Sequence, residues 1–256
     1  MEITSARNPL LQSIRKAVST GRPTEEGYLV AEGPHLVEEA LRSSWRVAQI
    51  VTTTAGKLKH ADLIRSANVE TVTAASRPFE SASDTRHSQQ ILALVEPKKW
   101  TWQDLMPENA LILALDAIQD PGNAGTMVRS AEAFGATGLL FLMGSAHVAN
   151  GKLLRSSAGS IFRVPFLESV KLADLLARAD GLNLFALDAN GPVPLPEARF
   201  QQPSVLIAGN EGSGVRPELL SKATRLSIPT RRVESLNAAV ACSLALYAAS
   251  QQRTSR

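Results

Sequence analysis

The stretch GNEGSGVRPELL, residues 209–220, places glycines beside an asparagine and a glutamate, directly after an apolar run. Glycines allow a backbone to approach a ligand closely, and Asn210 and Glu211 stand at the tip of the expected turn. The glycine spacing matches a phosphate-binding Walker A loop, but Val215 and Arg216 replace its lysine and hydroxyl residue. A dinucleotide-binding fingerprint is also absent from the sequence. We therefore expect either a ligand loop without phosphate chemistry or a plain strand-to-helix turn.

A second polar group lies in DPGNAGTMVRSAEAFGA, residues 120–136, after the apolar run LILALD. Its proline, glycine and Asn123 suit a turn and a helix N-terminus. Three apolar residues then recur at helical spacing and predict a buried face: Met127, Ala131 and Phe134. Arg129 falls away from that face. It is a candidate ligand-binding residue, or half of a surface pair with Glu132 worth about 0.2–0.5 kcal/mol.

A third segment, RLSIPTRRVESLNAAVACSLALYAAS, covers residues 225–250. It begins with a short apolar strand that Pro229 ends. Ser235 or Asn237 can cap the following helix, which is almost entirely small and apolar. So many alanines indicate close packing, either inside the fold or against a second subunit.

The elements that must position these residues follow from the apolar runs. From residue 110 onward, uniformly apolar runs alternate with amphipathic helical patterns: LILALD, GLLFLM, NLFALDA and SVLIAG. Such runs are typical of strands covered on both faces, so we expect an α/β domain with a mainly parallel sheet. Three of the runs lead into turn-rich segments. Ligands of such sheets bind at that edge, which is where we expect a site.

The preceding part of the chain has a different texture. Residues 1–97 show helical periodicity in PHLVEEALRSS and short apolar runs in AQIVTT and QILALVE, which predicts a small mixed domain. Residues 98–108, within PKKWTWQDLMPEN, show neither period and are interpreted as a linker. Residues 109–256 then form the second domain.

Composition narrows the class of protein. The chain of 256 residues is 44% hydrophobic and 20% charged, as in ordinary globular proteins. It has neither an apolar run long enough for a bilayer nor a secretory signal, so we expect a cytoplasmic protein. The single cysteine, Cys242, is expected to be buried. No metal site is expected, because the four histidines lack metal-ligand spacing: His35, His60, His87 and His147.

The charge distribution permits a polyanionic partner. The isoelectric point is about 9.2, and residues 209–256 carry seven basic and three acidic side chains. This excess suits a phosphate-bearing ligand, although a solvated basic face would have the same composition.

Taken together, the three segments resemble the SpoU (TrmH-like) branch of the SPOUT RNA 2′-O-ribose methyltransferases. DPGNAGTMVRSAEAFGA is similar to the first motif of that family, LIAGNEGSGVRPELL to the second, and LSIP…VESLNAAVA to the third, in the same order. RSSAGSIFRVPF, residues 155–166, is similar to the segment between the first two motifs. ARNPLLQSIRKAV…YLVAEGPHLVEEAL resembles the L30e-like substrate-binding domain that often precedes them.

The resemblance, which covers nearly the whole chain, implies both fold and cofactor. It implies an α/β protein in which an L30e-like N-terminal domain precedes a SPOUT domain with a C-terminal trefoil knot. It also implies a homodimer, an RNA substrate and S-adenosylmethionine as methyl donor. The cofactor is expected against Gly209, Ile228 and Leu236, with Asn210 nearby. The glycines then admit a methyl donor, with no phosphate to bind.

The resemblance further implies a catalytic set. In the family, the arginine that matches Arg129 is proposed to accept the proton of the ribose hydroxyl, with four positioning residues: Asn123, Glu211, Ser235 and Asn237. Arginine is effectively always protonated in proteins. A second role therefore stays open for Arg129, in which it binds the flanking phosphate and orients the hydroxyl.

Substrate choice and two other classes remain to be weighed. Thr230, Arg231 and Arg232 stand where the family commonly has methionine and then glycine, which can alter the RNA that is accepted. Residues 1–97 are expected to select the RNA, ribosomal RNA being favoured over transfer RNA. One alternative is an RNA-binding module without catalysis, although the five candidate catalytic residues are present. A nucleotide-dependent oxidoreductase or NTPase is disfavoured by the missing fingerprints.

Overall fold

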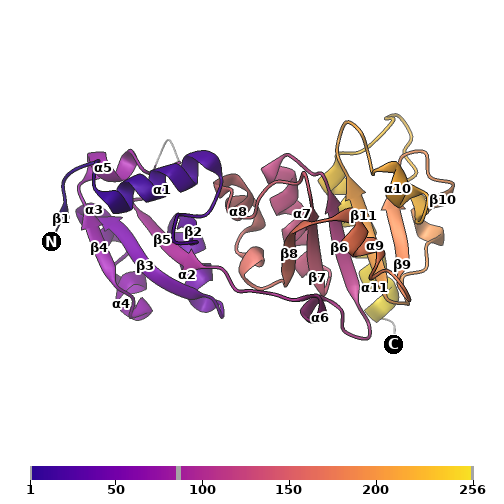
Figure 1. The fold of residues 1–256 in the computed structure, drawn as a ribbon, viewed down its shortest axis with the longest axis horizontal. Coiled ribbons are helices and arrows are strands. Elements are labelled where there is room, and N and C mark those ends of the chain that lie inside the picture. The colour runs from indigo at the N-terminus through magenta and orange to yellow at the C-terminus, as the bar shows by residue number, and fades with distance from the viewer. Residues whose placement is uncertain (1, 85–87, 255–256) are drawn as a thin grey trace. The chain divides into compact units, whose positions relative to one another are not determined.

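The computed structural model describes residues 2–84 and 88–254, so His87 lies outside the described residues (Figure 1). The chain forms two compact units, each built from two stretches: the first unit from Met1–Lys99 and His147–Arg163, and the second unit from Trp100–Ala146 and Val164–Arg256. The chain therefore passes between the units three times.

The first unit contains a five-stranded mixed sheet with the order β1-β4-β3-β5-β2. β4 pairs in parallel with β1 and β3, whereas β5 pairs antiparallel with β3 and β2. The runs AQIVTT and QILALVE lie in β3 and β5, as the sequence predicts. The strands are β1 (Glu2–Ile3), β2 (Leu29–Glu32), β3 (Arg46–Thr53), β4 (Thr71–Ala74) and β5 (Ile91–Glu96).

Helices cover this sheet through apolar faces. In α1 the side chain of Asn8 accepts a hydrogen bond from the backbone of Leu10, and Gly21, with φ of +63°, ends the helix. Leu11 and Ile14 of this helix are buried in the core, each burial contributing roughly 1.5–3 kcal/mol. The helices of residues 2–84 are α1 (Pro9–Thr20), α2 (Pro34–Arg42), α3 (Thr54–Lys59), α4 (Ala61–Ala67) and α5 (Ser76–Glu80).

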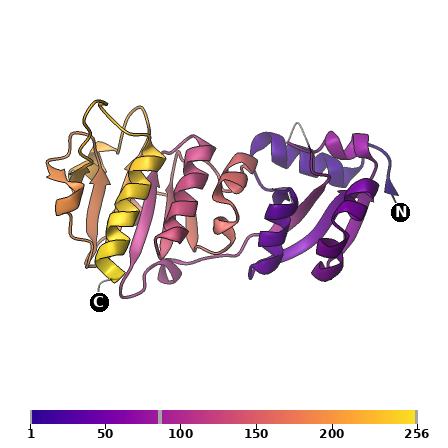
Figure 2. The same ribbon diagram turned by 180° about the vertical axis from the view of Figure 1, so that it is seen from behind.

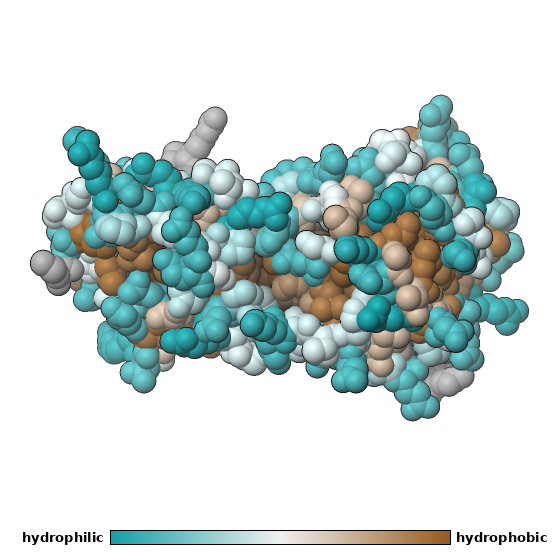
Figure 3. Space-filling model, in the orientation of Figure 1, coloured by the Kyte–Doolittle hydropathy of each residue, from teal (hydrophilic) through white to brown (hydrophobic). Residues whose placement is uncertain are grey.

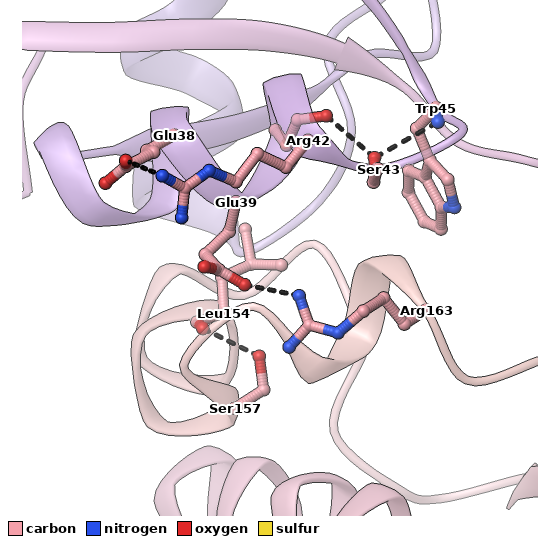
Figure 4. Close-up of polar contacts among 9 residues, drawn as sticks. Glu38, Glu39, Arg42, Ser43, Trp45, Leu154, Ser157 and Arg163 are labelled. Atoms are coloured by element: carbon pink, nitrogen blue, oxygen red, sulfur yellow. Dashed lines mark hydrogen bonds and ion pairs between the residues drawn. The ribbon is translucent and has the colours of Figure 1, made fainter. Parts of the chain in front are cut away.

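The segment 147–163 also belongs to the first unit, where it forms α8 (Gly151–Ser157) and the 3-10 helix η1 (Ser160–Phe162). Figure 4 shows Glu39 of α2 reaching toward Arg163, with which it forms an ion pair. The ring of Phe162 meets that of Trp45 edge-on at 5.3 Å. The predicted second domain, residues 109–256, includes this segment, whereas its packing partners are residues of the N-terminal part.

The second unit contains a seven-stranded sheet with the order β10-β12-β9-β11-β6-β7-β8, in which every pair is parallel. The predicted α/β class with a parallel sheet is confirmed, and the four apolar runs form β6, β7, β9 and β11. The strands are β6 (Leu111–Asp116), β7 (Gly138–Leu142), β8 (Phe166–Val170), β9 (Asn183–Leu187), β10 (Val193–Pro194), β11 (Ser204–Gly209) and β12 (Thr224–Ser227).

The two long helices of this unit, α7 and α11, lie side by side (Figure 2). The hydroxyls of Ser130 and Ser243 are hydrogen-bonded at 2.7 Å between them. The shorter helices α6, α9 and α10 contribute to an apolar cluster with the sheet. The helices are α6 (Trp102–Leu105), α7 (Pro121–Ala133), α9 (Leu172–Leu176), the 3-10 helix η2 (Leu195–Glu197), α10 (Pro217–Leu220) and α11 (Ala238–Thr254).

The segment interpreted as a linker contains α6. Thr101 and Asp104 form a capping box that starts this helix, and Leu105 is fully buried in the core of the second unit. Its side chain lies so close to Gly138 that a Cβ there would overlap it. The capping residues were present in the sequence, but one helical turn is too short to show a period.

In Figure 3 hydrophilic side chains lie along the outline of each unit, and hydrophobic ones gather within it. Within residues 2–84 and 88–254, no helix is long and apolar enough to cross a membrane. The trefoil knot stays a prediction, since strand order and pairing describe the sheet but not the threading of the C-terminal segment.

Candidate active site

The glycine loop, residues 209–216, leaves the carboxyl end of β11 and turns back at once. Backbone hydrogen bonds join Asn210 and Gly214 in both directions, at 3.1 and 2.9 Å. Gly214 has φ of +70°, a conformation that favours glycine. A Cβ on Gly209 would overlap the backbone of Gly214 and Val215. The loop is therefore compact. Its first residue, Gly209, must be glycine because the backbone of the loop's last residues packs directly against it.

A cavity of about 650 Å³ lies beside this loop. Its walls come from the ends of β9 and β11 and from the segment that leads into α11, mainly residues 187–190, 208–215 and 234–238. The four residues predicted to hold the cofactor all line it: Gly209, Asn210, Ile228 and Leu236. The cavity thus lies at the carboxyl edge of the parallel sheet, where a ligand site was expected.

Three of the predicted catalytic residues form one hydrogen-bond network. Asn123, in the first turn of α7, donates from Nδ2 to Oε1 of Glu211 at 2.5 Å. Asn237 donates from Nδ2 to Oδ1 of Asn123 at 3.2 Å, and its own Oδ1 accepts the backbone N–H groups of Ala239 and Val240. Asn237 is therefore the cap of α11, and both amide groups have set orientations.

The other two predicted catalytic residues lie differently. Ser235 is exposed and lines the cavity together with Glu211 and Asn237. Arg129 is exposed on α7 and does not line the cavity. Among the residues that the structure describes, Arg129 has neither a hydrogen bond nor an ion pair, so the alternative surface pair with Glu132 is not formed. The structure brings four candidates together and leaves Arg129 free in solvent.

Sequence reasoning missed a buried ion pair next to the loop. Asp116, the last residue of β6, is fully buried, and its carboxylate accepts from Nε of Arg216 at 2.6 Å and from the backbone N–H of Arg216 at 2.8 Å. Removing one partner of a fully buried pair commonly costs about 3–5 kcal/mol, and the 33% exposure of the Arg216 side chain makes the cost smaller here. A charged residue at the end of an otherwise apolar strand was the available signal, because such a carboxylate needs a partner.

Three further polar contacts shape the walls of the cavity. The side chain of Asn210 donates to the carbonyl of Ala117 at 3.0 Å and accepts the backbone N–H of Gly212 at 2.9 Å. Asp188, at the end of β9, accepts from Nε of Arg225 at 2.7 Å. The Asn210 side chain and its backbone are thus both engaged within the protein, which fixes the shape of the loop at the edge of the cavity.

The segment after Pro229 forms an exposed turn at the rim of the cavity. The Thr230 hydroxyl donates to the carbonyl of Val233 at 2.6 Å, and Thr230 itself lines the cavity. Arg231 and Arg232 lie between these two residues, both exposed, and neither has a hydrogen bond or ion pair within the described part of the chain. Two free guanidinium groups therefore stand beside the opening.

The single cysteine of the chain lies beneath the surface of the second unit. Cys242 is fully buried in α11, and burial raises the pKa of its thiol far above the ordinary value, so the reactive thiolate is disfavoured. The predicted burial of this residue is confirmed. Within residues 2–84 and 88–254 there is no group of three or more histidine, cysteine or acidic side chains that could hold a metal ion.

Comparisons with known proteins agree with this arrangement. Residues 110–247 match the SpoU rRNA Methylase family, and residues 8–93 match the MRM3-like substrate binding domain. The chain is 33% identical over 255 residues to the 23S rRNA (guanosine(2553)-2'-O)-methyltransferase RlmP of Bacillus subtilis (strain 168), covering 96% of this chain and 98% of the relative.

Two solved structures are similar over almost the entire chain. The SpoU methyltransferase AviRb from Streptomyces viridochromogenes, in complex with AdoMet, has a TM-score of 0.86 at 26% identity and covers 97% of this chain and 99% of its own. An AdoMet-bound rRNA methyltransferase from Sinorhizobium meliloti has a TM-score of 0.82 at 27% identity, with 98% and 97% covered. Since the family match spans more than half of the sequence and the relative aligns over nearly all of it, the chain belongs to the SpoU rRNA methylase family.

Proposed function

We propose that this protein transfers the methyl group of S-adenosylmethionine to a ribose 2′-hydroxyl of ribosomal RNA. The observation that carries the proposal is the Asn123–Glu211–Asn237 network, which adjoins the cavity that the predicted cofactor residues line. The family membership and the RNA named for the relative from Bacillus subtilis support the same substrate. We place this activity in the cytoplasm, with the RNA that it would modify.

The residues of the cavity fit S-adenosylmethionine. A volume of about 650 Å³ lies within the range of roughly 300–1,000 Å³ common for small-molecule sites. Apolar side chains such as Ile228 and Leu236 suit the adenine ring, while Asp188 and Glu211 offer carboxylates to an ammonium group. Gly209 lines the cavity, and its missing side chain lets the backbone of Gly214 and Val215 pack directly against it. When bound, the cofactor supplies a methyl group on a positively charged sulfur.

The protein's own groups would prepare the ribose hydroxyl. A hydroxyl is a poor nucleophile, so the site needs a group that orients it and takes up its proton. Within the network, the Glu211 carboxylate is the member that can accept a proton, and Asn123 and Asn237 hold it in position. Oε1 is bonded to Asn123, whereas Oε2 has no hydrogen-bond partner in the described part of the chain. Oε2 is therefore available to a ligand.

Arg129 fits an orienting role better than that of a base. Its side chain is exposed and unpaired among the described residues, and a guanidinium stays protonated at neutral pH. A phosphate next to the target ribose would supply the anionic partner that the planar fork recognises. Arg231 and Arg232 would add phosphate contacts at the rim of the cavity, and the first unit would select the RNA.

We further infer a homodimer. Three large apolar side chains are exposed along α11 at helical spacing: Val240, Leu244 and Tyr247, with 49%, 41% and 50% of their surface accessible. Such a stripe is typical of a helix that packs against a partner. The small residues of α11 would allow a close approach in a two-fold interface, where the same stripe meets itself.

Methyl transfer and ligand binding test the proposal. Unmodified 23S and 16S rRNA and bulk tRNA would be incubated with the protein and radiolabelled S-adenosylmethionine, and 2′-O-methyl positions would be mapped by resistance to alkaline hydrolysis. Calorimetric titration would compare S-adenosylmethionine with NAD and ATP. We expect the protein to bind S-adenosylmethionine but neither NAD nor ATP, and to methylate one rRNA nucleotide.

Other results would identify the competing functions. RNA binding without transfer, at saturating methyl donor, would indicate a binding module. Binding of NAD or ATP in place of S-adenosylmethionine would indicate a nucleotide-dependent enzyme. Methylation of tRNA and of neither rRNA would support the proposed reaction and contradict the proposed rRNA substrate.

A further inference from the structure

Asp116 lies against both ends of the glycine loop, through the pairing of its strand at the start and through its fully buried carboxylate at the end. Asp116 is the register partner of Gly209, because β6 and β11 pair in parallel and end together. At the other end of the loop, Oδ2 of Asp116 accepts the backbone N–H of Arg216 at 2.8 Å, and Oδ1 accepts from Nε of the same residue at 2.6 Å. One residue of the neighbouring strand thus fastens the loop where it begins and where it ends.

The geometry of this pair favours a role in holding the backbone. An arginine that serves to neutralise a carboxylate commonly uses two parallel N–H groups of its fork. Here one oxygen is given to the main chain of Arg216. Nη2 lies 2.6 Å from Oδ1 as an ion pair, yet it is buried without a hydrogen bond within the described part of the chain. Asp116 therefore lacks the two-oxygen, two-N–H arrangement with the guanidinium and instead accepts a hydrogen bond from the backbone of the loop.

The residue after Asp116 supports the loop in the same way. Ala117 has φ of +56°, a left-handed conformation that is uncommon for alanine, and its carbonyl accepts from Nδ2 of Asn210 at 3.0 Å. Asn210 in turn accepts the backbone N–H groups of Gly212 and Ser213. Two adjacent residues at the end of β6 therefore set the positions of Asn210 and Arg216, on either side of Glu211 and the tip.

We propose that Asp116 is a positioning residue for the methyl-donor site, which acts through the glycine loop. Its contacts hold the loop in the binding conformation before the ligand arrives, so that Gly209 and Glu211 face the cavity. This inference rests on the proposed S-adenosylmethionine function. Because a preorganised site loses less freedom on binding, disruption of the pair weakens ligand affinity rather than the rate of the saturated enzyme.

The test compares Asp116→Asn and Arg216→Lys with the wild-type protein. Asp116→Asn removes the charge and replaces one carboxylate oxygen with an amide donor, so at least one of the two hydrogen bonds from Arg216 is lost. Arg216→Lys keeps the backbone N–H and loses Nε. We expect the dissociation constant for S-adenosylmethionine, measured by calorimetry, to rise on the order of 10- to 100-fold in Asp116→Asn and by less in Arg216→Lys. KM for the methyl donor should rise in parallel, with kcat at saturation within about twofold of the wild-type value.

Arg253→Lys is the matched control. Arg253 lies away from the cavity lining, and its guanidinium donates to the carbonyls of Phe200, Asn109, Ala110 and Gln202. This variant should lower the melting temperature without changing the affinity for S-adenosylmethionine. Wild-type affinity for S-adenosylmethionine in Asp116→Asn would overturn the inference and leave the proposed function standing. If Asp116→Asn does not fold, the same result in Arg216→Gln would overturn it. Absence of binding by the wild-type protein would overturn the proposed function and the inference with it.

Discussion

The side-chain amide of Asn123 donates a 2.5 Å hydrogen bond to the carboxylate of Glu211, 88 positions further along the chain. The contact exists because β6 and β11 are neighbours in a parallel sheet, so the segments that follow them meet at one edge. It joins the start of α7 to the tip of the glycine loop. Substitution of either residue should therefore change the position of the other side chain.

Reversing the donor and acceptor tests this contact. Asn123→Asp places two carboxylates against each other, and we expect methyl transfer to fall by roughly 10²-fold, as for a misplaced reacting group. Adding Glu211→Gln restores a donor and an acceptor in exchanged positions. The double variant should recover binding of S-adenosylmethionine to within a few-fold of wild type but not full transfer, because the carboxylate has moved. No recovery of binding would mean that the charge of Glu211, and not the hydrogen bond, is what the ligand requires.

Arg129 is expected to affect transfer without affecting the cofactor. Arg129→Ala should leave folding and S-adenosylmethionine affinity near wild type, since Arg129 does not line the cavity, while single-turnover transfer falls by roughly 10² to 10⁴. Arg129→Lys keeps the charge but lacks the planar fork, so partial rescue is expected. Arg199→Ala, another exposed arginine of the second unit, is the control. Near wild-type rates in Arg129→Ala would place catalysis on other residues of the network.

Arg231 and Arg232 are expected to bind RNA phosphates. Alanine at both positions should raise the dissociation constant for RNA and reduce the dependence of log affinity on log salt by roughly 0.7–0.9 per lost contact. The control variant carries alanine at Lys171 and Arg199, two exposed basic residues of the second unit that do not line the cavity. Equal salt slopes in the two double variants would show that net charge alone is responsible.

The exposed stripe of α11 predicts a dimer that one charge can break. Leu244→Glu should weaken association by at least about 2 kcal/mol, roughly 30-fold, because a charge would be buried at the centre of the interface. Sedimentation equilibrium measures the effect. Leu58→Glu, at the 77% exposed Leu58 of the first unit, should leave the dimer intact. A wild-type monomer with full activity at micromolar concentration would contradict the prediction.

His147 should make the stability of the first unit sensitive to mild acid. Burial, and then the charge of Arg22, hold the pKa of this imidazole below its ordinary value, and its Nδ1 accepts the backbone N–H of Ala149. Between the lowered pKa and about pH 6.5, the unfolded chain binds more protons than the folded one. The contribution of neutral His147 to the free energy of unfolding is therefore complete above about pH 6.5 and is lost as the pH falls through the lowered pKa. His147→Asn keeps an acceptor that does not titrate. Urea unfolding between pH 7.5 and 5 should show a smaller loss of free energy in the variant, and identical pH profiles would refute this.

The sequence was sufficient for much of the second unit, for physical reasons. Strands covered on both faces are apolar throughout, so LILALD and SVLIAG were recognisable without knowledge of their partners. The rule that ligands gather at the carboxyl edge then predicted a site near Glu211, and Glu211 lines the cavity at that edge. α6 was missed because Leu105 is buried by a contact with Gly138 more than thirty residues away, which no local period records.

Contacts between distant residues account for the rest. Asp116 and Arg216 are 100 positions apart, and each has an ordinary local reading, as the end of a strand and the start of a helix. Residues 109–256 are predicted as one domain because the chain divides at the linker of residues 98–108, whereas Arg163 pairs with Glu39 and Arg155 with Asp84. Pairings of that range depend on the folded arrangement and leave no mark in neighbouring sequence.

Because the chain crosses between the two units three times, the first unit cannot be exchanged between proteins as one continuous segment. A domain joined by one linker can be transplanted as a single piece, whereas the first unit here would leave α8 and η1 behind. A chimera that takes another protein's residues 1–99 would then meet Arg155, Phe162 and Arg163 without their matching partners Asp84, Trp45 and Glu39. Substitutions in these two stretches are therefore expected to co-vary, and recombination between relatives should succeed when both are inherited together.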